Sequence, residues 1–272
     1  MSLVNATRSE LAKQFSTSMW WVLAIVLLVY IGATAIGLAA TFGAMASGAL
    51  PGASGPALPE PLIPTIIYTT ATAMGYVFPL LIGALLVTGE FRHKTLTPTF
   101  LATPRRGVAL AAKVAAGVIV GVVYALFGLL AAVGGGAAMF VVFGVDTQLG
   151  ESDMWAMFAR MVLAYVLWVL IGIGVGALVR NQVAAVVGVI AFTQFVEPIV
   201  RTIGGLVEAV QPVTRFLPGS SSDALVGGSL YTMIAGPGSD TTPWWAGGLV
   251  LLGYAVVLLV VGGATSWRRD VT

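Results

Sequence analysis

The stretch WWVLAIVLLVYIGATAIGLAATF, residues 20–42, indicates what kind of protein this chain is. It holds 23 residues and none of them is charged. A helix rises about 1.5 Å per residue, so roughly 20 apolar residues cross the ~30 Å hydrocarbon core of a bilayer. A cleavable signal sequence has an apolar core of only about 7 to 15 residues. We therefore expect residues 20–42 to form a retained membrane span.

The rest of the chain repeats this pattern. Hydrophobic residues make up 58% of the 272 residues and charged residues only 9%, against about 25% charged residues in a soluble domain. The sequence predicts an all-α integral membrane protein whose residues 1–272 form a single domain. Its six spans are expected at residues 20–42, 62–87, 108–133, 154–179, 183–196 and 244–265.

The third apolar run is longer than one span requires. Its apolar character continues from residue 108 to residue 145, interrupted only by the three glycines 134–136. These 38 residues are too few for two spans and a turn. We expect one tilted or extended helix, loosened at the glycines.

Charge orients the chain. Six spans put both termini on the same side, and the positive-inside bias places that side in the cytoplasm. The basic residues on this side are Arg8, Lys13, Arg92, Lys94, Arg105, Arg106, Lys113, Arg180, Arg268 and Arg269. They occur in short loops and form no continuous patch, so the expected partners are membrane lipids and not nucleic acid.

Two segments outside the spans should be helical. Residues 3–17 place Leu11 and Phe15 near one face, with Arg8 and Lys13 among the polar residues, which predicts an interface helix on the inner membrane surface. A frayed tail is the alternative. Residues 197–243 are broken by several prolines, which favours short re-entrant or interfacial helices on the outer side, for example at 199–210.

Most catalytic chemistry is missing from the sequence. The chain has no cysteine and one histidine, so it encodes no disulfide, no thiol nucleophile and no HExxH metal site. None of its three lysines follows a glycine, so it has no GxxxxGK[ST] nucleotide loop. We expect no catalytic residue, metal or cofactor on this chain. Glu197 and Arg201 are expected to form an i,i+4 pair at the outer boundary, with no carboxylate deep in a span.

The stretch GEFRHKTLTPTFLATPRR, residues 89–106, is the only sizeable loop on the inner side between spans. A short helix is expected to begin at Glu90, and Pro104 is expected to turn the chain back toward the bilayer. A loop that only fixes topology would need basic residues, but neither Glu90 nor His93. That simpler reading remains the alternative.

This loop resembles a motif of the type-2 ABC exporter permeases, especially the small six-span bacterial members that pair with a separate ATPase chain. The pattern is E-[FY]-R-H-x-T-x-x-P-T-x-L-x-T-P-R-R, and the resemblance extends over almost the whole chain. Lys94 stands where glycine is expected in many relatives. The matching residues are Glu90, Phe91, Arg92, His93, Thr95, Pro98, Thr99, Leu101, Thr103, Pro104, Arg105 and Arg106.

The resemblance implies a complex of two permease copies, here a homodimer, and two ATP-binding subunits that carry ATP and Mg. It implies a bacterial cell membrane location with both termini cytoplasmic. Loop 89–106 would be the coupling helix on the ATPase, beside the interface helix with Arg8, Leu11, Lys13 and Phe15. The coupling residues would be Glu90, Phe91, Arg92, His93, Lys94, Thr95, Pro104, Arg105 and Arg106.

The resemblance also implies that spans one, two and five form the central cavity and the dimer contacts. Gly172, Gly174 and Gly176 are an alternative dimer contact, because small residues let helices approach closely. The expected cargo is hydrophobic or amphipathic: a drug, lipid or peptide. A non-transporting membrane sensor or regulatory module is the alternative function. Candidate pathway residues, for which core packing is an equal alternative, are Thr65, Tyr68, Thr69, Thr72, Thr193 and Gln194.

Overall fold

The computed structural model describes residues 2–48, 59, 61–102, 105–207, 210–229, 231–232 and 242–265. All regular elements in these ranges are helices, and six helical stretches are long and apolar enough to cross a membrane. The chain is therefore a multi-pass, all-helical membrane protein. The six stretches are Met19–Ala46, Leu62–Arg92, Arg106–Phe143, Ser152–Val179, Gln182–Gly204 and Trp244–Thr265.

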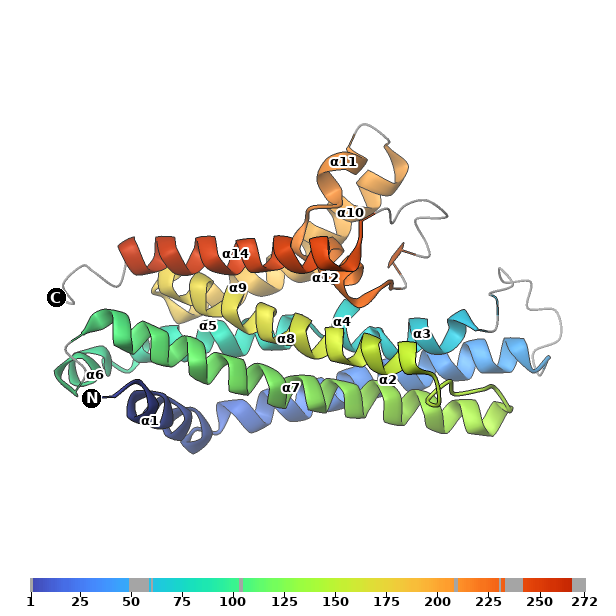
Figure 1. The fold of residues 1–272 in the computed structure, drawn as a ribbon, viewed down its shortest axis with the longest axis horizontal. Coiled ribbons are helices and arrows are strands. Elements are labelled where there is room, and N and C mark those ends of the chain that lie inside the picture. Colours follow the sequence, from blue (N-terminus) through green and yellow to red (C-terminus); the bar gives the residue numbers. More distant parts are fainter. Residues whose placement is uncertain are drawn as a thin grey trace.

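The long helices lie side by side along one axis (Figure 1). They are α2 (Met19–Ala46), α5 (Val77–Arg92), α7 (Arg106–Phe143), α8 (Ser152–Val179) and α14 (Trp244–Thr265). The short helices α1 (Leu3–Ser16) and α6 (Leu96–Ala102) share one end of the bundle, which we call the α1 end. The expected interface helix at residues 3–17 is thus present as a helix. Most of the expected connection at 47–61 lies outside the described residues.

The third span is one uninterrupted helix, as the length of its apolar run predicted. The 38 residues of α7 extend about 57 Å, well beyond the thickness of a hydrocarbon core. The glycines do not loosen it. A Cβ at Gly136 would lie 2.8 Å from Ile67, and one at Gly135 would lie 2.9 Å from Ile36. These glycines instead let α7 pack closely against the first and second spans.

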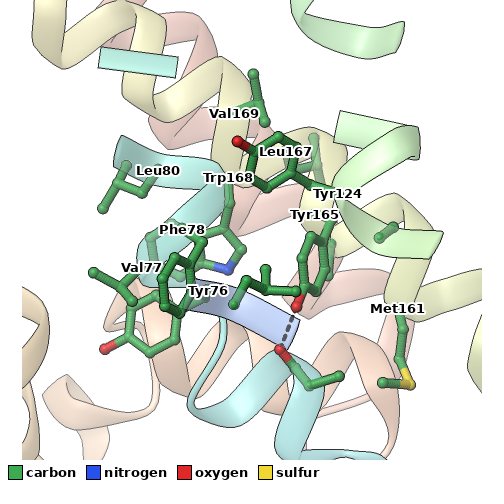
Figure 2. Packing of buried hydrophobic residues seen from close by; sticks show 14 of the residues in the cluster. Tyr76, Val77, Phe78, Leu80, Tyr124, Met161, Tyr165, Leu167, Trp168 and Val169 are labelled. Atoms are coloured by element: carbon green, nitrogen blue, oxygen red, sulfur yellow. Dashed lines mark hydrogen bonds between the residues drawn. The ribbon is translucent and has the colours of Figure 1, made fainter. Parts of the chain in front are cut away.

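The second span is broken, although the sequence predicted one continuous helix. It consists of α3 (Leu62–Tyr68), α4 (Thr70–Ala73) and α5, with a turn at residues 74–76. The Tyr165 hydroxyl donates to the carbonyl of Ala71 at this turn, at 2.6 Å (Figure 2). Only glycine fits at position 75, because a Cβ there would lie 2.1 Å from that carbonyl oxygen. The break places Tyr76 beside Trp168, with ring centroids 4.5 Å apart.

Close glycine contacts join the second, fourth and sixth spans. A Cβ at Gly172 would lie 2.2 Å from the carbonyl oxygen of Leu80, and one at Gly176 would lie 2.5 Å from that of Ala84. Gly174 faces α14, where a Cβ would lie 2.5 Å from Leu258. All three glycines that the sequence offered as a dimer contact are used within the chain. The second span is the most buried of the six, and the fifth and sixth are mostly exposed.

The fifth span continues beyond the predicted limit at residue 196. It is formed by α9 (Gln182–Ala191), a π-helical turn (Phe192–Val196) and α10 (Glu197–Leu206). The short helices α11 (Gln211–Thr214) and α12 (Pro218–Val226) follow, and α10 and α11 project from the bundle (Figure 1). Short helices in this region were predicted, but the one expected at 199–210 begins at Glu197 and ends at Leu206.

The α5–α8 contact predicts a measurable cost for one methyl group. Gly172→Ala should lower the free energy of unfolding by about 1–3 kcal/mol, because the new Cβ meets backbone that cannot rotate away. Gly188→Ala in α9 is the matched control, since a Cβ there has nothing within 4 Å. Thermal melting in detergent compares the two variants. Equal melting temperatures would contradict the packing argument.

Candidate functional site

The helix α1 turns its polar side toward the protein. Ala6, Glu10 and Gln14, spaced four residues apart, are buried, whereas Leu3 and Val4 are exposed. A soluble helix would show the opposite arrangement. The exposed face also carries polar residues, among them Arg8, and its placement at the inner membrane surface stays a prediction.

Four charged side chains meet where α1, α5 and α7 come together. The ammonium of Lys113 lies 2.6 Å from Glu10 Oε2 and 2.9 Å from Glu90 Oε2, and donates to the Leu86 carbonyl at 3.3 Å. The ammonium of Lys13 lies 2.5 Å from Glu90 Oε1 and also pairs with Glu10 Oε1. We call Glu10, Lys13, Glu90 and Lys113 the charge cluster. Each carboxylate contacts both ammonium groups, so the formal charges cancel.

Burial makes this cluster a strong constraint. The side chain of Lys113 has no exposed surface, and those of Glu10 and Glu90 are 7% and 8% exposed. The contact between Lys113 and Glu90 is an ion pair whose angles lie outside those of a hydrogen bond. Coulomb attraction therefore joins these two groups. Removing one partner would leave an uncompensated buried charge, which is costly.

The chain turns at His93 and Lys94, directly after the end of α5. The amide of Thr95 donates to the Glu90 carbonyl at 3.0 Å, and the amide of Lys94 donates to the Phe91 carbonyl at 3.4 Å. These are the two bonds of a Schellman turn, which ends α5. Lys94 has a φ of 54°, in the left-handed region that favours glycine. Glycine would adopt this conformation without the steric cost of a side chain.

The turn separates a buried anchor from an exposed basic tip. Arg92, His93 and Lys94 are exposed, whereas Glu90 is held in the charge cluster. The helix expected to begin at Glu90 begins instead at Leu96, because Glu90 belongs to the last turn of α5. The hydroxyl of Thr99 in α6 lies 3.3 Å from Glu90 Oε1 and connects this helix to the cluster.

The other residues predicted for coupling differ in exposure. Phe91 packs against the core, Thr95 is exposed in the turn that follows α5, and Arg105 is exposed directly before α7. Arg106 is the first residue of α7 and is half-buried. Pro104 lies outside the described residues.

The interface helix places its four predicted residues differently. Arg8 is exposed, Leu11 packs against the core, and Lys13 joins the charge cluster. Phe15 is exposed and meets the Trp20 ring edge-on, with centroids 5.1 Å apart. Of these four, Lys13 forms an ion pair with Glu90 in the last turn of α5.

The candidate pathway residues do not gather in one place. Tyr68, Thr69 and Thr72 are buried in the second span, where both threonine hydroxyls donate to carbonyls three residues earlier. The Tyr68 hydroxyl donates to the Thr147 carbonyl, and Thr65 is half-buried. The three buried residues therefore take part in packing and hydrogen bonding inside the protein. Thr193 and Gln194 differ, since both line a pocket beside the fifth span.

The prediction that Glu197 and Arg201 pair with each other is wrong. Arg201 pairs with Asp223 of α12, and Glu197 accepts the amide of Gly219 and contacts the Tyr76 hydroxyl at 3.2 Å. Glu197 is fully buried within the fifth helical stretch, where no carboxylate was expected. Its partners come from α12 and the broken second span, which sequence spacing could not reveal.

Sequence reasoning identified Glu90 and Lys13 but missed Glu10 and Lys113. Lys113 was counted only as a basic residue near the inner side, although it lies within an apolar helix, which is a signal of function. Neither a protein-family model nor a curated protein matches this chain. The features that indicate function are therefore the charge cluster, the exposed tip and the membrane spans.

Breaking the charge cluster should destabilise the chain. Lys113→Met leaves two buried carboxylates beside a single ammonium and is expected to cost about 3–5 kcal/mol of unfolding free energy. The double variant Lys113→Met with Glu10→Gln restores charge balance and should recover much of that loss. Arg8→Met removes an exposed charge from α1 and serves as the control, expected within about 0.5 kcal/mol of wild type. Denaturation in detergent measures all three. Similar losses for Lys113→Met and Arg8→Met would contradict the cluster's role.

Alkaline pH should weaken the cluster. Burial lowers the pKa of Lys13, but hydrogen bonds and charges from Glu10 and Glu90 outweigh it, so the pKa lies above its ordinary value. Stability from this group is complete below the ordinary lysine pKa and is lost as pH rises through the higher folded value. Melting temperature should therefore fall as the pH rises past about 10.4, the ordinary lysine pKa. The fall should be smaller in Lys13→Met, and an unchanged pH profile in that variant would contradict the assignment.

Proposed function

We propose that the chain is the membrane-spanning subunit of an ATP-driven ABC exporter in the bacterial cell membrane. Two copies form a homodimer, both termini are cytoplasmic, and a separate ATP-binding subunit, which carries ATP and Mg, docks on the loop at residues 89–106. The cargo is hydrophobic or amphipathic. This chain performs no covalent step, since its role is to couple a conformational change to passage of the cargo.

One observation supports this proposal most strongly. The exposed tip Arg92–His93–Lys94 begins two residues after Glu90, which is joined to α1 and α7 through the charge cluster. A force on the tip would reach α1, α5 and α7 together, because separating them would expose or isolate buried charges. A loop that only fixed topology would need no such attachment.

The arrangement also fits the energetics of coupling. An ATPase that binds the tip more tightly in one arrangement of the spans shifts the equilibrium toward that arrangement. Its binding energy is then linked to the cargo pathway by a coupling free energy, typically about 1–3 kcal/mol. The basic tip favours an acidic surface on the ATPase, because charge complementarity directs docking.

The first test is whether an ATPase with a phosphate-binding loop is encoded beside this gene and co-purifies with the chain. Arg92→Glu reverses an exposed charge at the tip without touching the cluster, so the chain should melt as wild type does. Co-purification with the ATPase and ATP-dependent transport should both fall about tenfold, which is the effect of a lost charge-assisted contact. Arg215→Glu, an exposed arginine after α11, is the matched control.

Transport is measured in vesicles with a panel of lipophilic compounds, with and without ATP. Unchanged ATP hydrolysis and transport in Arg92→Glu would show that the tip does not couple. Failure of the ATPase to bind, with a different cytoplasmic partner held by the same tip, would support the sensor or regulatory alternative.

A further inference from the structure

A pocket of about 140 Å³ lies beside the break in the second span. Tyr30 of α2, Tyr76 at the break, Gln194 and Arg201 of the fifth span, and Tyr231 line it. Drug-sized ligands fill about 300–1,000 Å³, so this pocket holds a part of such a molecule. Its size suits a headgroup.

Among the described residues that line the pocket, Arg201 is the charged one. Its Nη2 pairs with Asp223, and its guanidinium lies 4.4 Å from the centre of the Tyr231 ring. Within the described part of the chain, no hydrogen bond uses its Nε or Nη1. A planar guanidinium with unused donors at a pocket wall is suited to a carboxylate or phosphate oxygen.

The nearby carboxylates are turned away from the pocket. Asp223 is 1% exposed and accepts from Ser229 at 2.7 Å as well as from Arg201. Glu197 is fully buried, with one oxygen at the Gly219 amide in the first turn of α12, the positive end of that helix. Neither lines the pocket, although both reduce its positive potential.

Hydrogen-bond donors complete the wall. The hydroxyls of Tyr30 and Tyr231 make no hydrogen bond within the described residues, and the side-chain amide of Gln194 makes only a weak one, at 3.4 Å to Thr193. Together with Arg201 they offer several donors to one ligand. A ligand rich in acceptor oxygens is therefore favoured over one that can only donate.

The surroundings of the pocket are apolar. Val26 lies one turn before Tyr30 on the same face of α2 and is 48% exposed, and Phe195 follows Gln194 and is 63% exposed. A molecule whose headgroup reached Arg201 would have such surface beside it for a tail. A small hydrophilic ion would gain nothing from these side chains.

We propose that this pocket binds the anionic headgroup, a phosphate or carboxylate, of an amphipathic molecule whose apolar tail lies against α2 and the fifth span. This rests on the proposed function and narrows its cargo class from hydrophobic or amphipathic compounds to anionic amphipaths. Arg201 provides the charge and Asp223 holds it in place. Tyr30, Tyr231 and Gln194 donate to the headgroup oxygens.

The experiment uses the full chain in nanodiscs of zwitterionic lipid and compares two probes that share a dodecyl tail with one anion that has no tail. Dodecyl phosphate, dodecyltrimethylammonium and inorganic phosphate are titrated by calorimetry, with empty nanodiscs subtracted. Dodecyl phosphate should bind more tightly than the other two. The double variant Arg201→Gln with Asp223→Asn replaces both members of the ion pair. It should weaken the binding of dodecyl phosphate about tenfold without leaving a buried charge unpaired. Arg215→Gln, the same change outside the pocket, should have no effect.

A second variant protects the test against misfolding. Gln194→Leu removes an exposed hydrogen-bond donor and leaves the ion pair intact. It should weaken the binding of dodecyl phosphate about threefold. Equal binding of the phosphate and ammonium probes, or unchanged binding in both pocket variants, would overturn the proposal. Tight binding of inorganic phosphate would point to a free anion and overturn the amphipathic part.

This assay needs no ATPase, so its outcome is separate from that of the proposed function. Loss of Arg201-dependent binding while Arg92→Glu still uncouples the ATPase would reject the pocket alone. Arg201-dependent binding in a chain that associates with no ATPase would reject the exporter function and retain the pocket.

Discussion

The ammonium of Lys113 is fully buried near one end of the bundle, and the arrangement of three helices follows from it. An isolated buried charge costs several kcal/mol, so Lys113 requires carboxylates at close range. Glu10 of α1 and Glu90 of α5 supply them, at 2.6 and 2.9 Å. The helix α1 therefore lies beside the end of α5, and the loop that follows α5 begins at a fixed point. Lys13 adds a second ammonium, and this balances the two carboxylates.

Close backbone contacts carry this constraint into the membrane-spanning part. Gly83, Gly172 and Gly176 let α5 and α8 approach until a single Cβ would overlap a carbonyl group. Lipid chains are as apolar as the side chains, so packing and hydrogen bonding hold such helices together instead of the hydrophobic effect. The second span is therefore the closely packed centre of the helix bundle. The break at residues 74–76 is supported on one side by Tyr165 and Trp168.

The break in the second span lies between the exposed tip at the end of α5 and the pocket that contains Arg201. After the break, α5 runs as one helix through Glu90 to Arg92, the first residue of the exposed tip. At the break itself, Tyr76 contacts Glu197 and lines the pocket that contains Arg201. A displacement of α5 along its axis would act on both places, since Tyr76 immediately precedes its first residue. Binding of a partner at the tip could in this way displace α5 and change the position of Tyr76 in the pocket wall.

The sequence alone determined the membrane class, the six apolar stretches and the single long third helix, because span length and apolar pattern are local properties. Tertiary structure decided the rest. Lys113 and Glu10 are 103 residues apart in sequence, and Tyr76 and Glu197 are 121 apart, so no spacing rule could pair them. The break in the second span depends on a hydroxyl from α8, and the glycines offered as a dimer contact meet helices of their own chain. Such pairings follow from which helices become neighbours, and that is settled only when the whole bundle packs.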